Sequence, residues 1–236
     1  MIIAIIPARG GSKRIPRKNI KLFCGKPIIA WSIEAAQISG CFDSILVSTD
    51  DQEIASIARQ FGADVPFERP AALSDDYAGT TAVIRHAVQW HTENRGEISI
   101  ACCLYPTAPF VTADDLKRGR NVLLDSDAEY AFAVTSYGSP IQRAMRINAD
   151  NRLQMFDPSH FNRRTQELEI AYHDAGLFYW GKKDAWLQEK LIFSEIAAAI
   201  VMPRLRVQDI DTSEDWERAE MIFNVMRGSA WAVAPV

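Results

Sequence analysis

A cluster of basic residues near the N-terminus is the first feature of the sequence that could do chemistry. The apolar run Ile2–Ile6 leads into the segment Pro7–Asn19, and this segment holds five cations within ten residues, namely Arg9, Lys13, Arg14, Arg17 and Lys18. Gly10 and Gly11 let the backbone bend and bring N–H groups close to an anion. A nucleoside triphosphate carries about four negative charges near pH 7, and such a cluster would neutralise most of them. The segment therefore predicts a triphosphate site.

The glycine spacing in this loop separates it from the two commonest phosphate-binding motifs. It matches neither G-x-x-x-x-G-K-[ST] nor G-x-G-x-x-G, which argues against a Walker P-loop and against a dinucleotide site. From composition alone, a solvated basic turn remains an alternative. The whole chain has a formal net charge of -4. Nucleic-acid binding is therefore not expected, because the cations gather at one loop of an acidic protein.

A pair of carboxylates near the other end of the chain is the second chemical feature. In Gln208–Thr212, alternation along an extended segment puts Asp209 and Asp211 on the same side. Mg²⁺ takes oxygen ligands and usually shares them with substrate phosphates, so two convergent carboxylates suit it. Taken alone, an isolated D-x-D more often serves to cap a helix.

The elements that would position these groups alternate between strands and helices. Helices are expected from Pro27, after Asp50, over Thr80–Glu93, from the capping residue Thr112 to Leu124, and over Glu214–Met226. Strands are expected at Ile2–Ile6, Ser44–Ser48, Ile98–Leu104, Glu129–Tyr137, Gly176–Trp180 and Ile200–Leu205. This alternation predicts an α/β fold with a doubly wound, mostly parallel sheet. Ligands of such sheets bind at the carboxyl ends of the strands, where the basic loop begins.

Residues 138–171 interrupt the alternation. Ala144–Ile147 and Leu153–Phe156 flank an Asn148–Asn151 turn cluster and predict a hairpin. An arm that cannot bury its own apolar face often packs on a second subunit, so we expect a homodimer. We therefore expect a single domain over residues 1–236, with 138–171 as an inserted excursion.

Length, cysteine usage and hydropathy limit the class of protein. A chain of 236 residues with 48% hydrophobic content suits one globular domain with a full core. The four cysteines fit neither a zinc site nor a disulfide framework, which is typical of reduced thiols in the cytosol. No apolar run is long enough to span a bilayer. We therefore expect a cytoplasmic protein with no membrane partner, and the tail Arg227–Val236 to be loosely ordered.

The loop Ile6–Asn19 resembles the signature loop of the CMP-sugar synthetases, a family that activates sialic, pseudaminic and legionaminic acids and KDO with CTP. Further segments match in order over nearly the whole chain, so the resemblance implies a Rossmann-like nucleotidyltransferase fold. It implies that Lys18 stabilises charge on the α-phosphate, and that Arg9, Asp209 and Asp211 also serve catalysis, the two aspartates as Mg²⁺ ligands. The nucleotide-binding residues implied by position are Ala8, Arg9, Gly11, Ser12, Lys13, Lys18, Asn19, Arg69, Ala78 and Thr80.

Two internal segments carry the resemblance further. Glu68–Asp76 resembles the family's R-P-x-x-L stretch, from which Arg69, Ala78 and Thr80 are implied to contact cytidine. Leu104–Phe110 resembles L-Q-P-T-S-P-L, with Tyr105 where sialic acid synthetases carry a glutamine that contacts the sugar. This departure argues against sialic acid as the substrate.

The run Tyr172–Trp180 bears on which sugar is used. It resembles the Y-H-D-A-G-x-F-Y-W pattern of the pseudaminic acid branch, and it has His173 where the sialic acid branch has an arginine. Adjacent strand residues face opposite ways, so His173 and Asp174 are not expected to form a catalytic dyad. Leu177, Tyr179 and Trp180 also suit an ordinary buried strand. The residues implied to bind the sugar are Tyr105, Thr107, Arg164, Tyr172, His173, Asp174 and Phe178, with Arg143 and Arg163 as other candidates for its carboxylate.

The expected reaction is transfer of CMP from CTP to pseudaminic acid, with release of pyrophosphate. The nearest alternative is the same reaction on legionaminic or N-acetylneuraminic (sialic) acid. An NAD-dependent oxidoreductase would fit the fold but lacks the glycine fingerprint in the first turn. A non-enzymatic sugar-nucleotide sensor could keep the loop, but it would not need the aspartate pair.

Overall fold

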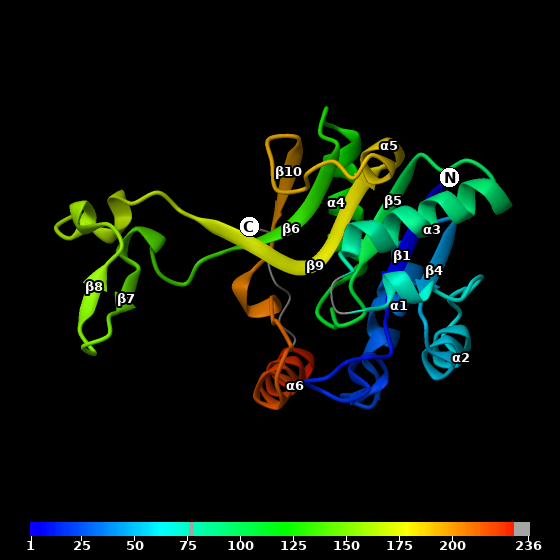
Figure 1. Cartoon of the computed structure of the whole chain (residues 1–236), viewed down its shortest axis with the longest axis horizontal. Coiled ribbons are helices and arrows are strands. Elements are labelled where there is room, and N and C mark those ends of the chain that lie inside the picture. The colour runs from blue at the N-terminus through cyan, green and yellow to red at the C-terminus, as the bar shows by residue number, and fades with distance from the viewer. Residues whose placement is uncertain (76–77, 229–236) are drawn as a thin grey trace.

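The computed structural model of the chain, which describes residues 1–75 and 78–228, is built on a six-stranded sheet with the order β10-β6-β9-β5-β1-β4 (Figure 1). Strand β9 runs antiparallel to both of its neighbours, and the other pairings are parallel. The strands are β1 (Ile2–Pro7), β4 (Ser44–Ser48), β5 (Ile100–Leu104), β6 (Tyr130–Ser136), β9 (Tyr172–Lys182) and β10 (Ala197–Val201). The mostly parallel sheet expected from the sequence is confirmed.

Helices cover both faces of this sheet, so the doubly wound arrangement is also confirmed. One face carries α1 (Ile28–Ser39), α2 (Gln52–Gln60) and α4 (Ala113–Leu124), whose apolar residues share a core with alternate residues of the strands. The other face carries α3 (Thr80–Arg95) and α5 (Lys183–Leu187). Burial of strands on both faces explains why β1 and β5 read as almost continuous apolar runs.

The C-terminal helix α6 (Ser213–Gly228) packs beside the site rather than on the sheet. Its Trp216 and Phe223 form a third apolar cluster with Ile15, Phe23 and Phe110. The Thr212 hydroxyl accepts from the backbone N–H of Asp215, whose carboxylate accepts from that of Thr212, which is the expected capping box. Ile15 of the basic loop and Ile210, which lies between Asp209 and Asp211, both belong to this apolar cluster, so the cluster joins the two segments.

The sequence placed the last strand wrongly. It runs over Ala197–Val201 instead of Ile200–Leu205, and Arg204–Arg206 forms a 3₁₀ turn. The strand ends before Pro203, which has no backbone N–H to give to a sheet and favours a change of direction. Of the expected loose tail, Arg227 and Gly228 belong to α6, whereas residues 229–236 lie outside the described part, as does Asp76 in the R-P-x-x-L stretch.

The excursion forms the hairpin that the sequence predicted, from β7 (Met145–Ile147) and β8 (Leu153–Met155). Figure 1 shows it beyond the ends of β6 and β9, standing away from the sheet. Two further short strands, β2 (Leu22–Phe23) and β3 (Lys26–Pro27), form a small hairpin before α1. None of the helices in the described ranges combines the length and the apolar character that a membrane crossing requires.

Candidate active site

Two adjoining cavities open at the carboxyl ends of β1 and β5. The first encloses about 520 Å³ and the second about 700 Å³, and Lys18, Tyr105 and Thr107 line both. The first cavity is otherwise lined by Pro7, Arg9, Ser12, Lys13, Arg14, Asn19, Arg69, Leu73, Asp75, Ala78, Thr80, Val83 and Pro106. The second is otherwise lined by His173, Asp174, Ala175, Gly176, Val207, Gln208, Asp209, Ile210, Asp211, Asp215 and Arg218. Two ligands bound side by side would therefore meet at the shared wall.

Four of the five loop cations line the first cavity, and the exception is Arg17. Its guanidinium donates to Asp51, with Nη2 to Oδ1 at 2.9 Å, and pairs with Glu53. The hydrogen bond with Asp51 raises the pKa of Arg17 and lowers that of Asp51. The backbone of Arg17 is left-handed, with φ at 56°. Arg17 therefore fastens the loop to the start of α2, and the expectation that it contributes to a triphosphate site is corrected.

Of the two loop glycines, Gly10 lets Asp50 and Asp51, which follow β4, come close to the basic loop. The backbone N–H of Gly10 donates to Asp50 Oδ1 at 2.9 Å, and a Cβ added at Gly10 would lie 2.7 Å from Asp51 Oδ2. A side chain at this position would therefore collide with Asp51. The N–H of Gly10 therefore donates to a carboxylate of the chain itself and does not point to a bound phosphate, as the sequence had suggested. Gly11 has open space around its Cα and does not line the cavity.

Hydrogen bonds from side chains to backbone carbonyl oxygens connect the loop to the segment that precedes α3. Asn19 Nδ2 donates to the carbonyl oxygen of Arg9 at 2.9 Å, and Arg9 Nη1 donates to the carbonyl oxygen of Asp75 at 2.9 Å. The Asp75 carboxylate in turn accepts from the N–H of Ala78 at 2.7 Å. Ala8 is buried, and its N–H donates to Ser48. Arg9, Asn19 and Ala78 are thus brought to the first cavity, whereas Ala8 lies beneath it.

A buried guanidinium, that of Arg69, lines the first cavity. Arg69 donates from Nε to Ser48 Oγ at 3.0 Å and from Nη2 to the carbonyl oxygen of Ser48. Burial lowers the pKa of Arg69 to about 10, against the opposing charge of Asp50. Thr80, the first residue of α3, has its hydroxyl 3.4 Å from that of Tyr105. The expected nucleotide residues Arg69 and Thr80 therefore both line the first cavity.

The acidic pair lines the second cavity, and two cations of the basic loop face Asp211. Lys18 Nζ donates to the carbonyl oxygen of Ile210 at 2.8 Å and lies 3.3 Å from Asp211 Oδ1. Arg14 Nη2 lies 2.8 Å from the same carboxylate oxygen. Burial, and then the charge of Asp211, raise the pKa of Asp209. Both aspartates line the second cavity, and Ile210 between them is buried in the third apolar cluster.

The chemistry of this pair fits a hard divalent cation. Within residues 1–75 and 78–228, no three side chains of His, Cys, Asp or Glu are grouped so that they could hold a metal. The donor set is therefore two carboxylates. Burial and then the charge of Asp211 raise the pKa of Asp209, and a cation between the carboxylates would offset both effects. Mg²⁺ is commonly bound by one or two carboxylates, with the remaining ligands from water and substrate phosphates.

A buried ion pair anchors the segment that carries the two aspartates. Arg206 donates to both carboxylate oxygens of Asp115, at 2.6 and 2.8 Å, with side-chain exposures of 12% and 6%. Asp115 also completes the capping box with Thr112 at the start of α4. Burial tends to raise the pKa of Asp115, but the hydrogen bonds from Arg206 and Thr112 outweigh it and lower the pKa.

Asp115→Asn should destabilise the fold by about 3–5 kcal/mol, because it leaves the Arg206 guanidinium buried without its counter-charge. The pKa of Asp115 is lower in the folded protein than in the unfolded chain, so its charge stabilises the fold when the pH is above the unfolded-state pKa. This stabilisation is lost as the pH falls through the pKa of Asp115 in the folded protein. Urea unfolding should thus show a gap between variant and parent at pH 7 that narrows below about pH 4. Asp114→Asn, at a neighbouring side chain that is 91% exposed, is the control and should change little. An equal loss in both variants would contradict this assignment.

The second cavity contains some of the expected sugar residues but not all. His173 and Asp174 both line it, and His173 Nδ1 lies 2.8 Å from the backbone carbonyl oxygen of Asp174. The Asp174 carboxylate instead accepts from Tyr179, so the two side chains are not arranged as a dyad.

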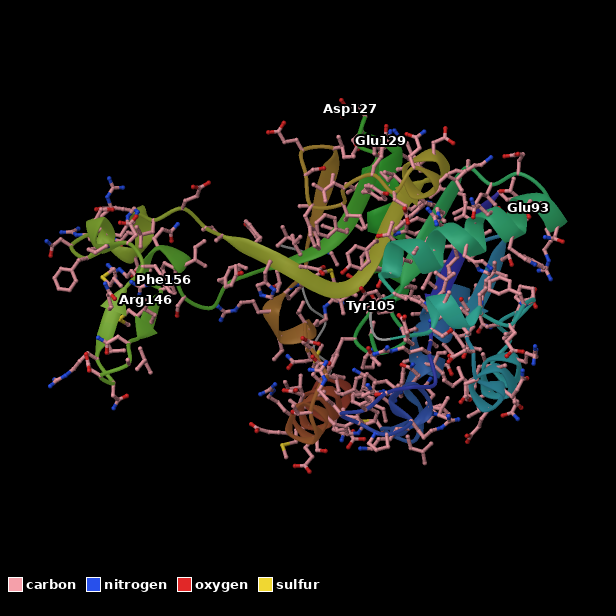
Figure 2. All side chains as sticks on the ribbon, viewed as in Figure 1. Glu93, Tyr105, Asp127, Glu129, Arg146 and Phe156 are labelled. Atoms are coloured by element: carbon pink, nitrogen blue, oxygen red, sulfur yellow. The ribbon has the colours of Figure 1, made fainter. Side chains whose placement is uncertain are left out.

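Three expected sugar residues lie elsewhere in this chain. Phe178 is fully buried in the core, where it faces Gly119. Tyr172 is exposed where β9 leaves the sheet, and Arg164 is exposed in the excursion. Figure 2 shows how far the excursion, marked by Arg146 and Phe156, lies from Tyr105. Neither cavity of this chain includes these three residues.

Sequence reasoning missed several residues that shape the site. Asp50 and Asp51 hold the basic loop, Arg206 holds the acidic segment, and Tyr179 holds Asp174. A signal was present for the first two, because they directly follow β4, the parallel neighbour of β1. No local pattern marks Arg206, and the pattern over Tyr172–Trp180 includes Tyr179 without indicating that it holds Asp174.

Comparison with known proteins agrees with this geometry. A family profile described as cytidylyltransferase matches residues 3–226. A Campylobacter jejuni subsp. jejuni protein named pseudaminic acid cytidylyltransferase is 46% identical over 97% of this chain and 99% of its own length. The CMP-N,N'-diacetyllegionaminic acid synthase of Legionella pneumophila subsp. pneumophila is 31% identical over 95% of this chain and 97% of its own.

A solved structure extends the comparison to the fold. It is that of CMP:2-keto-3-deoxy-manno-octonic acid synthetase complexed with CTP, with a TM-score of 0.68, 17% identity and coverage of 95% of this chain and 98% of that one. At this identity the likeness concerns the fold. The family profile and the relatives together cover nearly the whole chain. The covered residues include the basic loop, the shared wall and the acidic pair, which line two adjoining cavities. The chain belongs to the cytidylyltransferase family.

Proposed function

We propose that this chain is a CTP:pseudaminic acid cytidylyltransferase, which forms CMP-pseudaminic acid and pyrophosphate. The observation that carries the proposal is the pair of cavities that meet at Lys18, Tyr105 and Thr107. One cavity has the cations for a triphosphate, and the other has polar groups for a sugar. The choice of sugar rests on the relative that is 46% identical over nearly the full length of both chains and bears this substrate in its name.

The proposed reaction exchanges one bond to phosphorus for another. The anomeric hydroxyl oxygen of the sugar bonds to the α-phosphorus of CTP, the bond between that phosphorus and the α–β bridging oxygen breaks, and pyrophosphate leaves. The hydroxyl proton passes to solvent. Lys18 stands at the shared wall, where the α-phosphate and the sugar would meet, and its charge offsets the negative charge that develops there.

The other loop cations hold the triphosphate for an in-line displacement. Arg9, Lys13 and Arg14 line the first cavity with Ser12, and the triphosphate would lie across them. Arg69 and Thr80, which also line the first cavity, would donate to a cytosine or ribose oxygen. A bound Mg²⁺, held by Asp209 and Asp211, would neutralise phosphate charge.

The test is release of pyrophosphate from CTP and Mg²⁺, with pseudaminic, legionaminic, N-acetylneuraminic acid and KDO offered in parallel. Release with pseudaminic acid alone supports the reaction and the substrate together. Release with legionaminic or N-acetylneuraminic acid would keep the reaction but assign the alternative substrate. No release with any of the four sugars would overturn the proposal.

A homodimer belongs to the same proposal, with the reaction placed in the cytoplasm as the sequence suggested. The excursion exposes apolar side chains on a hairpin that stands away from its own sheet, among them Ile147 and Leu153, which pair directly across the two strands. A second copy of the chain is the proposed cover for this surface. In this proposal Arg164, which is exposed in the same arm, would supply the cation that a sugar carboxylate in the partner's second cavity needs.

Leu153→Asp should convert the protein from dimer to monomer, because it puts a charge into the proposed contact. Light scattering coupled to size exclusion measures the mass directly. Met221→Asp, on α6, is the matched control, since its side chain is 66% exposed against 69% for Leu153. It should leave the dimer intact. A parent protein that is already monomeric at micromolar concentration would refute the dimer.

A further inference from the structure

A bulge in β9 brings two side chains to one face that strand alternation alone would separate. Phe132 and Val134 of β6 are two residues apart and pair with Tyr179 and Asp174 of β9, which are five residues apart. Residues two apart on a strand point to the same face, and so do the residues that pair with them on the neighbouring strand. Phe132 and Val134 therefore place their partners Tyr179 and Asp174 on one face, and β9 accommodates three more residues between these partners than regular pairing would allow. Gly176, inside the bulge, has φ at 61°, a conformation that other residues adopt at a cost.

The bulge is fastened to the strand that carries the shared wall. The backbone N–H of Tyr105 donates to the carbonyl oxygen of Leu177 at 2.9 Å, and the Tyr105 and Tyr179 rings lie 5.5 Å apart. Figure 2 shows Tyr105 beside the bend of β9. A displacement of the bulge would therefore move the wall between the two cavities.

Tyr179 fixes the Asp174 carboxylate. The buried Tyr179 hydroxyl donates to Asp174 Oδ2 at 2.5 Å, and the Gly176 N–H donates to Asp174 Oδ1 at 3.1 Å. The Tyr179 ring is itself held by stacking on Phe132, with centroids 5.6 Å apart. Each carboxylate oxygen thus has one donor from the chain and a further lone pair available, and Asp174 remains exposed to the second cavity.

From this geometry we infer that Tyr179 is a positioning residue for the sugar: through its hydroxyl it holds Asp174 so that the carboxylate accepts a hydrogen bond from a hydroxyl or amide N–H of the substrate. The inference rests on the proposed function. Tyr179 does not contact the sugar itself, and it serves binding of the sugar rather than of CTP, because Asp174 lines only the second cavity.

The test compares Tyr179→Phe with Asp174→Asn and with the double variant, in steady-state kinetics with CTP, Mg²⁺ and the sugar that the parent enzyme uses. Tyr179→Phe should raise the KM for the sugar about tenfold, the usual weight of a hydrogen bond to a charged group, and leave the KM for CTP within twofold. Asp174→Asn should raise the sugar KM at least as much. The double variant should be no worse than Asp174→Asn, because the tyrosine acts through the aspartate.

Tyr130→Phe is the matched control. Tyr130 is a buried tyrosine of the same sheet, and its hydroxyl donates to the carbonyl oxygen of Ala185 at 2.7 Å, away from both cavities. This variant loses the same kind of hydrogen bond, so it should leave both KM values unchanged. Equal effects of Tyr179→Phe and Tyr130→Phe, or a rise in both KM values with Tyr179→Phe, would overturn the inference. A parent enzyme that uses none of the sugars would instead refute the proposed function, while a parent that is active beside an unaffected Tyr179→Phe refutes only the positioning role.

Discussion

Asp211→Asn should change two measurements in opposite directions. Turnover with Mg²⁺ should fall at least about a hundredfold, because a proposed metal ligand is lost. Affinity for CTP without any divalent cation should instead rise about fivefold. In the free protein Asp211 Oδ1 forms ion pairs with Arg14 Nη2 at 2.8 Å and with Lys18 Nζ at 3.3 Å. The same carboxylate would repel a triphosphate. Its neutralisation releases both cations, which is worth about 1 kcal/mol for partly exposed pairs.

Asp209→Asn separates the two effects. Asp209 has the metal role in the proposal but makes neither of these two ion pairs, so the variant should lose turnover without a comparable gain in metal-free CTP affinity. Calorimetric titration of CTP in chelator, beside pyrophosphate release in Mg²⁺, gives both quantities. Near-normal turnover in the two variants would remove the metal assignment. A lower metal-free affinity for Asp211→Asn would remove the idea that Asp211 competes with the triphosphate.

The parts of the site that the sequence predicted are those set by short-range patterns. The basic loop is visible because its cations are dense in an acidic chain, and the acidic pair because alternation along an extended segment is regular. The sheet is visible because its central strands are buried on both faces. Each of these features is determined by a few consecutive residues, so a short window of sequence is enough to predict it.

The parts that the sequence missed depend on distant contacts. Arg17 has the same charge as its neighbours, and only the arrival of Asp51 from the adjacent strand turns it away from the cavity. Phe178 and Tyr179 both lie in the core, on opposite faces of the sheet, and the β9 bulge decides that Asp174 comes to the face of Tyr179. A bulge depends on pairing with β6 and β5, so no window around residues 172–180 could reveal it.

Lys18→Met should lower kcat about a hundred- to a thousandfold, the second large effect, while the KM for CTP changes by only a few fold. The reasoning is that Arg9, Lys13 and Arg14 remain to bind the triphosphate, whereas Lys18 alone of the four belongs to both cavities. A charge at the shared wall interacts most strongly with the transition state, because negative charge builds on the α-phosphate oxygens there as the sugar hydroxyl oxygen bonds to phosphorus. Methionine keeps the length and apolar stem of the side chain.

Lys21→Met tests whether the loss of any nearby cation would do the same. Lys21 lies three residues further on, and its ammonium sits 4.4 Å from the centroid of the Trp216 ring, outside both cavities. Single-turnover rates at saturating CTP, which isolate the chemical step from binding, should be normal for Lys21→Met and slow for Lys18→Met. If Lys18→Met instead raised the KM for CTP and kept kcat, Lys18 would be one more phosphate contact and the shared wall would not be where the bond to phosphorus forms. The position of Lys18 between Asp211 and the first cavity makes the kcat effect the expected result, since that is where two substrates and a metal would converge.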